Sequence, residues 1–242
     1  MDEAPATSSP WTGKDVLLIV LGILAVLLAA LLALRLWAQA TGAEIEPSNL
    51  LSTALGLLEG VALIGSVYLL GIRRRGLDWD AVGLRLPSLQ WFIRSLWLGL
   101  AAIPLSALTA LLVQLLLNRP VENVQLEFLA PEGFSWFAAL SMLVLGGFVA
   151  PFAEELFFRA VLYPWMRARW GVLPGMLVSG VLFGAVHGEI SVAAAAALLG
   201  FLLAWVYERS SSLWPPVIIH VINNAFKILL LYALIAAGAP LE

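Results

Sequence analysis

The stretch Pro151-Phe152-Ala153-Glu154-Glu155-Leu156-Phe157-Phe158-Arg159 places two adjacent carboxylates and an arginine at the end of an apolar run, Phe134 to Phe152. A charged side chain costs about 2.5–3.5 kcal/mol at the centre of a membrane-spanning helix, so ionisable residues inside such a run indicate a functional site. On a helix, Glu155 and Arg159 share one face, where each lowers the cost of burying the other. Glu154 points about 100° away and has no local partner. The stretch therefore predicts one neutralised carboxylate and one that is free for chemistry.

Composition assigns the chain to the membrane proteins. It is 62% hydrophobic and only 12% charged, far from the balance of soluble domains. Cysteine is absent, which excludes a disulfide framework, a thiolate nucleophile and a cysteine-based metal site. The net charge is −3 and the basic residues are scattered, so nothing indicates nucleic-acid binding. The sequence predicts an all-α polytopic transmembrane helical bundle.

Seven apolar runs approach the length of about 20 residues that crosses a bilayer. Three precede the Glu-Glu stretch, one contains it and three follow: Val16 to Leu34, Leu50 to Ile72, Leu96 to Leu117, Phe134 onward, Val172 to Gly188, Val192 to Tyr207 and Val217 to Ala237. Residues 161–170 combine arginines with tryptophans and are expected at the membrane interface. The predicted organisation is a disordered cytoplasmic tail over 1–13, N-terminal helices over 14–133 and a functional core over 134–242.

Basic residues predict the orientation. If the seven spans alternate, only Arg35 and Arg119 fall on one side, and the other side is rich in arginine. The positive-inside rule places the arginine-rich side, and with it the N-terminus, in the cytoplasm. That side carries Lys14, Arg73, Arg74, Arg75, Arg85, Arg94, Arg167, Arg169 and Arg209, and the outer loops carry Glu44, Glu46, Glu122, Glu127 and Glu132.

Both histidines of the chain lie in predicted spans. His187 ends the stretch Phe183-Gly184-Ala185-Val186-His187, and Asn224 follows His220 by one helical turn on the same face. The helical rise puts Glu154 and His187 each about 20 Å inside the cytoplasmic interface, and His220 about 9 Å past Trp214. We therefore expect these side chains around one cavity that opens toward the cytoplasm. The alternatives are histidines that only form interhelical hydrogen bonds, and a solvated Glu pair at a helix end.

Two further features accompany these polar residues. Gly180, Gly184 and Gly188 form a small-residue ridge, which favours close packing between helices. Lys227 lies on the same stripe as His220, one turn deeper than Asn224, and Glu59 is the unpaired acid at comparable depth. Lys227 needs a partner at this depth, and Glu59 is the candidate for an ion pair with it.

Several functions are compatible with a glutamate, two histidines and an asparagine inside a membrane. In a hydrolase, Glu154 takes a proton from water, which attacks a carbonyl, while an imidazole and the Asn224 amide stabilise the oxyanion. In a zinc enzyme, Glu154, His187 and His220 are the ligands, although the His-Glu-x-x-His motif is absent. A proton-coupled transporter would use Glu and His as a relay, but no two-fold repeat of spans is evident. A non-catalytic immunity or scaffold protein is the remaining alternative.

Three motifs together resemble the CPBP family, the intramembrane endopeptidases that comprise type II CAAX prenyl proteases and bacterial relatives linked to bacteriocin processing and immunity. The order, the spacing and the placement in spans all agree with the family. Glu-Glu-x-x-x-Arg matches Glu154, Glu155 and Arg159, Phe-x-x-x-His matches Phe183 and His187, and His-x-x-x-Asn matches His220 and Asn224. The resemblance covers Phe134 to Tyr232.

The resemblance implies a role for each matched residue. Glu154 activates the water with help from His187, His220 and Asn224 hold the oxyanion, and the Glu155–Arg159 pair keeps the site in shape. No cofactor is favoured, with zinc on Glu154, His187 and His220 as the alternative. The implied partners are the lipid bilayer and a membrane protein or lipidated peptide as substrate, in a bacterial inner membrane. The best-known members have eight spans, which makes eight the alternative to seven here.

Overall fold

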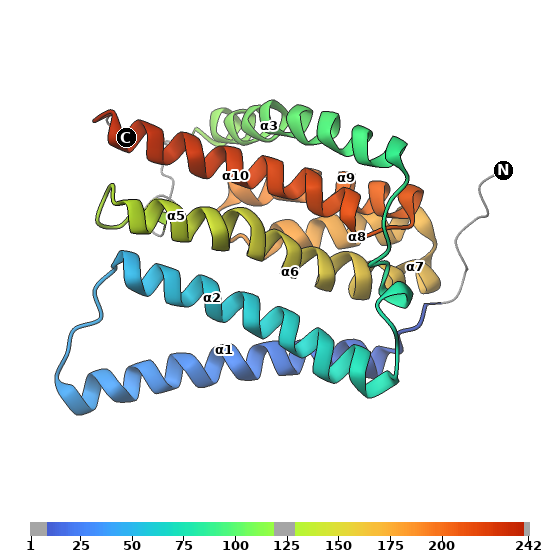
Figure 1. Cartoon of the computed structure of the whole chain (residues 1–242), viewed down its shortest axis with the longest axis horizontal. Helices are drawn as coiled ribbons and strands as arrows, with labels where there is room; N and C mark the ends of the chain where they lie inside the picture. Colours follow the sequence, from blue (N-terminus) through green and yellow to red (C-terminus); the bar gives the residue numbers. More distant parts are fainter. Residues whose placement is uncertain (1–8, 119–128, 240–242) are drawn as a thin grey trace.

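The computed structural model in Figure 1 describes residues 9–118 and 129–239. Within these ranges the chain forms helices and no strands, and six of the helices are long and apolar enough to cross a membrane. A seventh apolar helix, Val172–Ala185 (α8), has only 14 residues. The prediction of an all-α polytopic bundle is confirmed, and the chain is an integral membrane protein. Arg119, Glu122 and Glu127, used to predict the orientation, lie outside the described residues.

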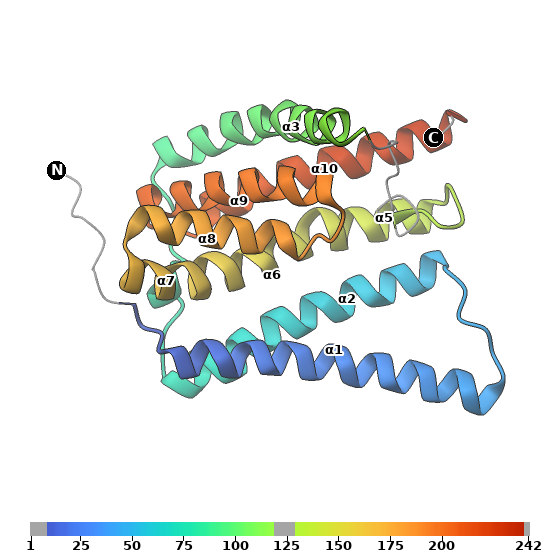
Figure 2. The same cartoon turned by 180° about the vertical axis from the view of Figure 1, so that it is seen from behind.

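The N-terminal part of the bundle consists of an antiparallel hairpin and a separate helix. The hairpin pairs Gly13–Thr41 (α1) with Asn49–Ser66 (α2), and a π-helical segment, Val67–Arg73 (η1), continues α2. A short 3-10 helix, Asp80–Val82 (η2), then leads into Leu89–Leu117 (α3). In Figures 1 and 2, α3 lies on one flank of the bundle and the α1–α2 hairpin on the opposite flank.

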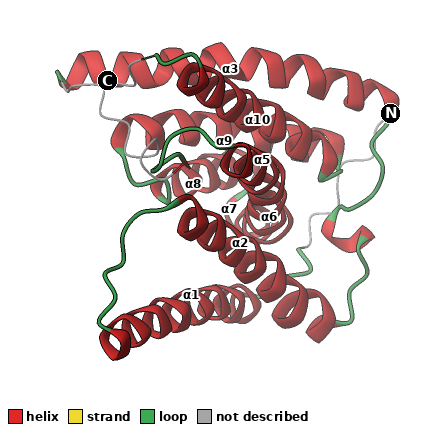
Figure 3. Cartoon of the chain, turned by 60° about the vertical axis from the view of Figure 1, so that its left-hand side comes forward, coloured by secondary structure: helices red, strands yellow, loops and turns green. Residues whose placement is uncertain are grey.

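The C-terminal part begins with one continuous helical segment of 35 residues, Trp136–Trp170. Two π-helical segments interrupt its α-helical geometry, and such segments occur frequently at functional sites. Its successive parts are Trp136–Val144 (α5), Leu145–Val149 (η3), Ala150–Phe157 (α6), Phe158–Leu162 (η4) and Tyr163–Trp170 (α7). After α8, Ile190–Ser210 (α9) and Trp214–Ala236 (α10) complete the bundle. Figure 3 shows α5 and α6 in the middle, between α10 and α2.

Local sequence explains where several helices begin and end. The Thr12 side chain accepts from the backbone N–H of Asp15, and the Asp15 carboxylate accepts from that of Thr12, so a capping box starts α1. Ser135 caps α5 by accepting from the backbone N–H of Ala138 at 3.0 Å. Gly171, with φ of 85°, separates α7 from α8 and permits the sharp reversal between them.

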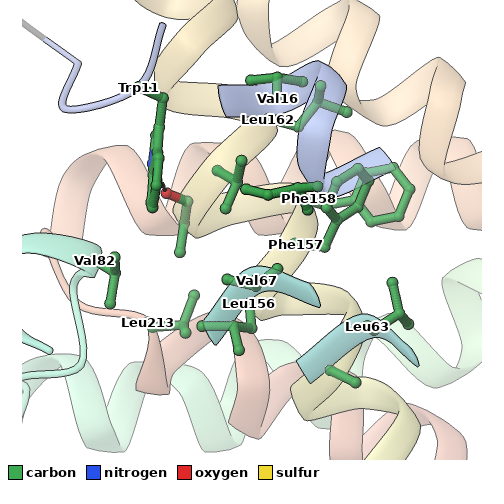
Figure 4. Packing of buried hydrophobic residues seen from close by; sticks show 14 of the residues in the cluster. Trp11, Val16, Leu63, Val67, Val82, Leu156, Phe157, Phe158, Leu162 and Leu213 are labelled. Carbon is green, nitrogen blue, oxygen red and sulfur yellow. Dashed lines mark hydrogen bonds between the residues drawn. The ribbon is translucent and has the colours of Figure 1, made fainter. Parts of the chain in front are cut away.

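The largest apolar core lies where α1, the end of α2 and the α6–η4 segment meet (Figure 4). Trp11 belongs to it: its side chain is 2% exposed and its indole N–H donates to the carbonyl of Ala160 at 2.6 Å. The predicted disordered tail over 1–13 is therefore wrong for residues 9–13, because an indole satisfied in this way holds the chain against η4. Residues 1–8 of the predicted tail lie outside the described residues.

The small-residue ridge packs α8 against α9, as predicted, at two of its three glycines. A Cβ on Gly184 would clash with the carbonyl oxygen of Ala193, and a Cβ on Gly180 would come within 2.9 Å of that of Ala197. Gly188 does not belong to the ridge: it lies beyond the end of α8, has open space around it and adopts φ of +76°. Gly188 is instead needed for its backbone conformation, because the turn that joins α8 to α9 uses a positive φ that glycine adopts readily.

Candidate active site

A buried carboxylate joins three helices. The Oε1 atom of Glu155, on α6, accepts from Nη1 of Arg159 at 3.0 Å and lies 2.9 Å from Nδ1 of His220, on α10. Nη2 of Arg159 donates to the backbone carbonyl of Gly200, on α9, at 3.0 Å. The Glu155 and Arg159 side chains are fully buried and that of His220 is 2% exposed. The predicted Glu155–Arg159 pair is present, and it also fixes one ring nitrogen of His220.

Phe183, on α8, supports this network with its ring. The Arg159 guanidinium carbon lies 4.4 Å from the centre of the Phe183 ring, within the range of a cation–π contact. The same ring makes an edge-type contact with His220 at a centroid distance of 5.4 Å and a tilted contact with His187 at 5.0 Å. Phe183 is fully buried. It therefore separates and orients the two imidazoles while it holds the arginine in place.

Glu154 differs from its neighbour in every contact. Its Oε2 atom lies 4.0 Å from Nε2 of His220 and, within the ranges the structure describes, has no hydrogen-bond partner. The side chain keeps 14% of its exposure, and it lines a cavity. His220 thus stands between the two carboxylates, with Nδ1 fixed by Glu155 and Nε2 directed toward Glu154.

The cavity has a volume of about 1030 Å³, large enough for a peptide segment. Its walls come from α1, α2, α3, α6, α8, α9 and α10, and most of them are aliphatic or aromatic. All four predicted catalytic residues line it: Glu154, His187, His220 and Asn224. His220 was estimated to lie at a shallower depth, but its contacts with Glu155 and Glu154 place it level with them.

His187 reaches the cavity from a turn and not from a helix. The predicted fifth span continued to Gly188, but α8 ends at Ala185 and residues 186 and 187 form a turn. Nδ1 of His187 lies 2.8 Å from the carbonyl oxygen of Phe183. Because a carbonyl only accepts, this nitrogen carries the proton, and Nε2 is left with a lone pair. The α8 helix is about 21 Å long by its rise, so this turn lies inside the bundle, where irregular backbone is tolerated because it lines a cavity.

A chain of amides extends the site along α10. Nδ2 of Asn224 donates to the carbonyl of Gly146, in η3, at 3.4 Å. The neighbouring Asn223 donates to Oδ1 of Asn224 at 3.3 Å and accepts from Ser106, on α3, at 3.2 Å. Asn223 and Ser106 also line the cavity, and the motifs did not point to either of them. In the sequence, Asn223 could have been noticed because it precedes the matched Asn224. Nothing in the sequence distinguishes Ser106 as a residue of the site.

The expected ion pair between Glu59 and Lys227 is not formed. Both side chains line the cavity, but Glu59, on α2, is close enough to Glu154 for their charges to interact, and Lys227 interacts with the two histidines. The packing of α2 accounts for the position of Glu59. A Cβ on the adjacent Gly60 would come within 2.8 Å of Val149 in η3, so this glycine lets α2 approach the segment that carries Glu154.

The alternative of a zinc site can be tested against the side-chain arrangement. Over residues 9–118 and 129–239, no group of three or more histidine, aspartate or glutamate side chains is arranged to hold a metal ion. Nδ1 of His220 contacts Glu155 and Nδ1 of His187 contacts a carbonyl, which leaves Nε2 as the nitrogen of each ring that could bind a metal. In the arrangement described, Glu154, His187 and His220 are not close enough together to form the zinc ligand set.

The fold and this site define a polytopic membrane protein with a carboxylate–imidazole centre inside the bundle. Residues 135–226 match the family model described as "Type II CAAX prenyl endopeptidase Rce1-like". The protein named "Putative membrane peptidase YdiL" of Bacillus subtilis (strain 168) is 27% identical over 89 residues, which are 37% of this chain and 36% of that protein. No solved structure gives a significant match. The family match spans all three motifs, so the resemblance to the CPBP family is confirmed for this segment.

Proposed function

We propose that the protein is an intramembrane endopeptidase that hydrolyses a peptide bond of a membrane-associated or lipidated protein. The observation that carries this proposal is the position of Glu154: its side chain lines a cavity of peptide size, and its Oε2 atom lies 4.0 Å from Nε2 of His220 without a hydrogen-bond partner among the described residues. The match of residues 135–226 to a family of endopeptidases supports the same reaction class.

In the proposed reaction, Glu154 acts first as a general base. It accepts a proton from a water molecule in the cavity while the water oxygen attacks the scissile carbonyl carbon. The carbonyl π electrons move to oxygen and give a tetrahedral oxyanion. When the intermediate collapses, the C–N bond breaks and Glu154 returns its proton to the leaving nitrogen. The products are a carboxylic acid and an amine, and no other reactant is consumed.

His220 and Asn224 stabilise the oxyanion in this scheme. Preorganised donors at such a position typically contribute a factor of about 100–1,000 each in turnover. His220 donates Nδ1–H to Glu155, so donation by Nε2–H to the oxyanion as well requires the doubly protonated ring in the intermediate. The only hydrogen bond that the Asn224 Nδ2 donor makes among the described residues is the 3.4 Å bond to Gly146, and because this bond is long, the amide can turn toward a substrate oxygen.

His187 assists Glu154. Its Nδ1–H is fixed by the Phe183 carbonyl, so its Nε2 lone pair can accept a hydrogen bond from the attacking water and orient it. The remaining matched residues act through others: Arg159 and Phe183 hold Glu155, and Glu155 holds His220. They are positioning residues.

We further propose that the α7 end of the bundle faces the cytoplasm of a bacterial cell and that the N-terminus is cytoplasmic. The support is the clustering of arginine near this end, in η1, in the segment after it and in α7. A substrate would then enter from the cytoplasm or laterally from the lipid, and lipid would cover the exposed leucines of α1 and α3.

The test is cleavage of a fluorogenic library of lipidated peptides by the purified full chain in detergent micelles. A hydrolase needs no proton gradient, so we expect cleavage in micelles by the unmodified chain and none by Glu154→Gln. Proton flux in liposomes that is lost on His187→Ala, with no peptide cut under any condition, would favour the transporter and overturn the proposal.

A further inference from the structure

Lys227 is a charged residue inside the cavity for which the proposed reaction has no use. It lies 13 residues into α10, about 20 Å from the start of that helix by the helical rise, and its side chain is exposed to the cavity that it lines. Within the described ranges, no carboxylate pairs with Lys227, Glu59 included, and no other group accepts a hydrogen bond from it. An unpaired ammonium at this depth is costly, and intramembrane ionisable residues of this kind mark binding or transport sites.

The position of Lys227 relates it to the proposed cleavage point. It follows Asn224 by three residues and His220 by seven, so all three share one face of α10, and Lys227 lies about 5 Å along the axis beyond Asn224. A peptide whose scissile carbonyl is held near His220 and Asn224 would therefore run past the Lys227 ammonium.

We propose that Lys227 is a specificity residue that binds a carboxylate of the substrate on the far side of the cleavage point from the cytoplasm. This inference rests on the proposed function, because it takes the occupant of the cavity to be a peptide. The carboxylate is the chain terminus or an acidic side chain, and both present the same chemistry to the ammonium.

The other charged residues of the cavity favour the binding of an anionic group next to Lys227. Among the described residues, the two histidines are the ionisable groups on which the charge of Lys227 acts, and neither of them is an anion that could pair with it. Glu59 and Glu154 interact with each other instead, so the negative charges of the protein lie apart from the lysine. The largely apolar walls would strengthen a charge-assisted hydrogen bond in comparison with water.

The test measures binding and not turnover. The protein is the full chain with Glu154→Gln, in micelles, and the probes are three fluorescent N-acylated pentapeptides: one with a free carboxyl terminus, one with a terminal amide, and one with a terminal amide and aspartate as its last residue. Affinity is read from fluorescence anisotropy. We expect the free acid to bind about ten- to a hundredfold more tightly than the amide, as a hydrogen bond to a charged group implies. Tight binding of the aspartate peptide identifies a side chain as an accepted source of the carboxylate, and weak binding restricts the source to the terminus.

Variants assign the effect to Lys227. Lys227→Met is expected to reduce binding of the acid to the level of the amide, Lys227→Arg to retain the preference, and Glu59→Gln, the matched control, to retain it as well. Equal binding of acid and amide to the protein with Lys227 intact overturns the inference, even if Lys227→Met does not fold. A preference for the acid over the amide that survives Lys227→Met overturns the inference too. So does equal binding of the two peptides when phosphatidylglycerol displaces both, because the cavity would then bind a lipid.

The two proposals fail separately. A carboxylate preference in a protein that never cuts a peptide bond contradicts the endopeptidase and leaves an anion-binding cavity. Cleavage with no carboxylate preference contradicts only the role of Lys227.

Discussion

The two sides of α6 carry neighbouring glutamates that the bundle treats in opposite ways. On one side, Glu155 is fully buried and contacts Arg159 and His220, and through Arg159 it is tied to α9. On the other side, Glu154 keeps 14% of its exposure, approaches His220 only to 4.0 Å and lines the cavity. Identical side chains at adjacent positions therefore have different surroundings: Glu155 connects helices, and Glu154 is the carboxylate for which we propose the reactive role.

This difference teaches how a bundle can hold a reactive carboxylate at membrane depth. A buried charge is tolerated when opposite charge and hydrogen bonds surround it, and removing one partner of such a pair is strongly destabilising. Because Glu155 takes up the arginine and one nitrogen of His220, Glu154 remains unneutralised beside an imidazole of fixed orientation. The contacts of Glu155 thus fix the geometry of the site, and the proposed reactivity belongs to Glu154.

The largest effect expected is the loss of activity on Glu154→Gln. The amide cannot accept the proton of water, and a positioned general base typically contributes a factor of about 100–10,000. Stability should change by less than about 0.5 kcal/mol, because the substitution removes no hydrogen bond of the Oε2 atom. Peptide cleavage and thermal unfolding of the same micellar preparation measure the two quantities.

Glu155→Gln, the matched variant, should act mainly on stability. It leaves Arg159 buried without its counter-charge, a change that typically costs about 3–5 kcal/mol. Thermal unfolding in micelles should show a clear decrease relative to Glu154→Gln, with activity reduced as well because His220 loses its anchor. Equal thermal shifts and equal activities for the two variants would contradict the separate roles.

Asn224→Ala tests a residue that lines the cavity and leaves the contacts of Glu155 with Arg159 and His220 in place. Loss of one oxyanion donor is expected to lower turnover by about 100–1,000-fold. Its two hydrogen bonds, to Gly146 at 3.4 Å and from Asn223 at 3.3 Å, are both long and contribute little, so the fold should persist. Asn223→Ala is the control on the adjacent position; if both variants retained normal turnover in the cleavage assay, the oxyanion role of the amide would be wrong.

The smallest effect expected is that of metal removal. The proposed mechanism uses carboxylate, imidazole and amide only, so prolonged chelation followed by cleavage assay should leave activity unchanged. A zinc enzyme would behave differently, because the metal generates its nucleophile by lowering the pKa of bound water to about 7. Full loss of activity on chelation, restored by stoichiometric zinc, would replace the glutamate-only mechanism with the zinc one.

Helical periodicity was enough to predict the ion pair of Glu155 on one side of α6, and the absence of a local partner for Glu154 on the other side. The spacing of Glu155 and Arg159 predicts their pair, and the pair is present at 3.0 Å. The apolar runs likewise predicted the helices. The contact of His220 with Glu155 depends on how α10 is rotated against α6, which spacing within one helix does not encode. Depth estimates from single helices therefore placed His220 wrongly.

Other features escaped prediction for similar reasons. Trp11 was assigned to a disordered tail because its neighbours are polar, yet one indole hydrogen bond and an apolar groove bury it. Glu59 was the candidate partner of Lys227, but α2 packs closely at Gly60, and the charge of Glu59 acts on Glu154 instead. Each depends on contacts between segments far apart in the sequence. The catalytic roles of Glu154, His187, His220 and Asn224, in contrast, remain predictions that the experiments above decide.

The short length of α8 also has a consequence for the biogenesis of the protein. At about 21 Å it falls short of the hydrocarbon thickness of about 30 Å, so this helix cannot enter the bilayer as an independent span. The close fit at Gly184 and the turn of residues 186–189 pair it with α9, which has 21 residues. The two helices would therefore leave the insertion machinery as one hairpin with His187 at its tip. The His187 imidazole would reach the middle of the membrane only after both α8 and α9 have been synthesised. The proposed active site would therefore be completed late, when α6 is already in the membrane.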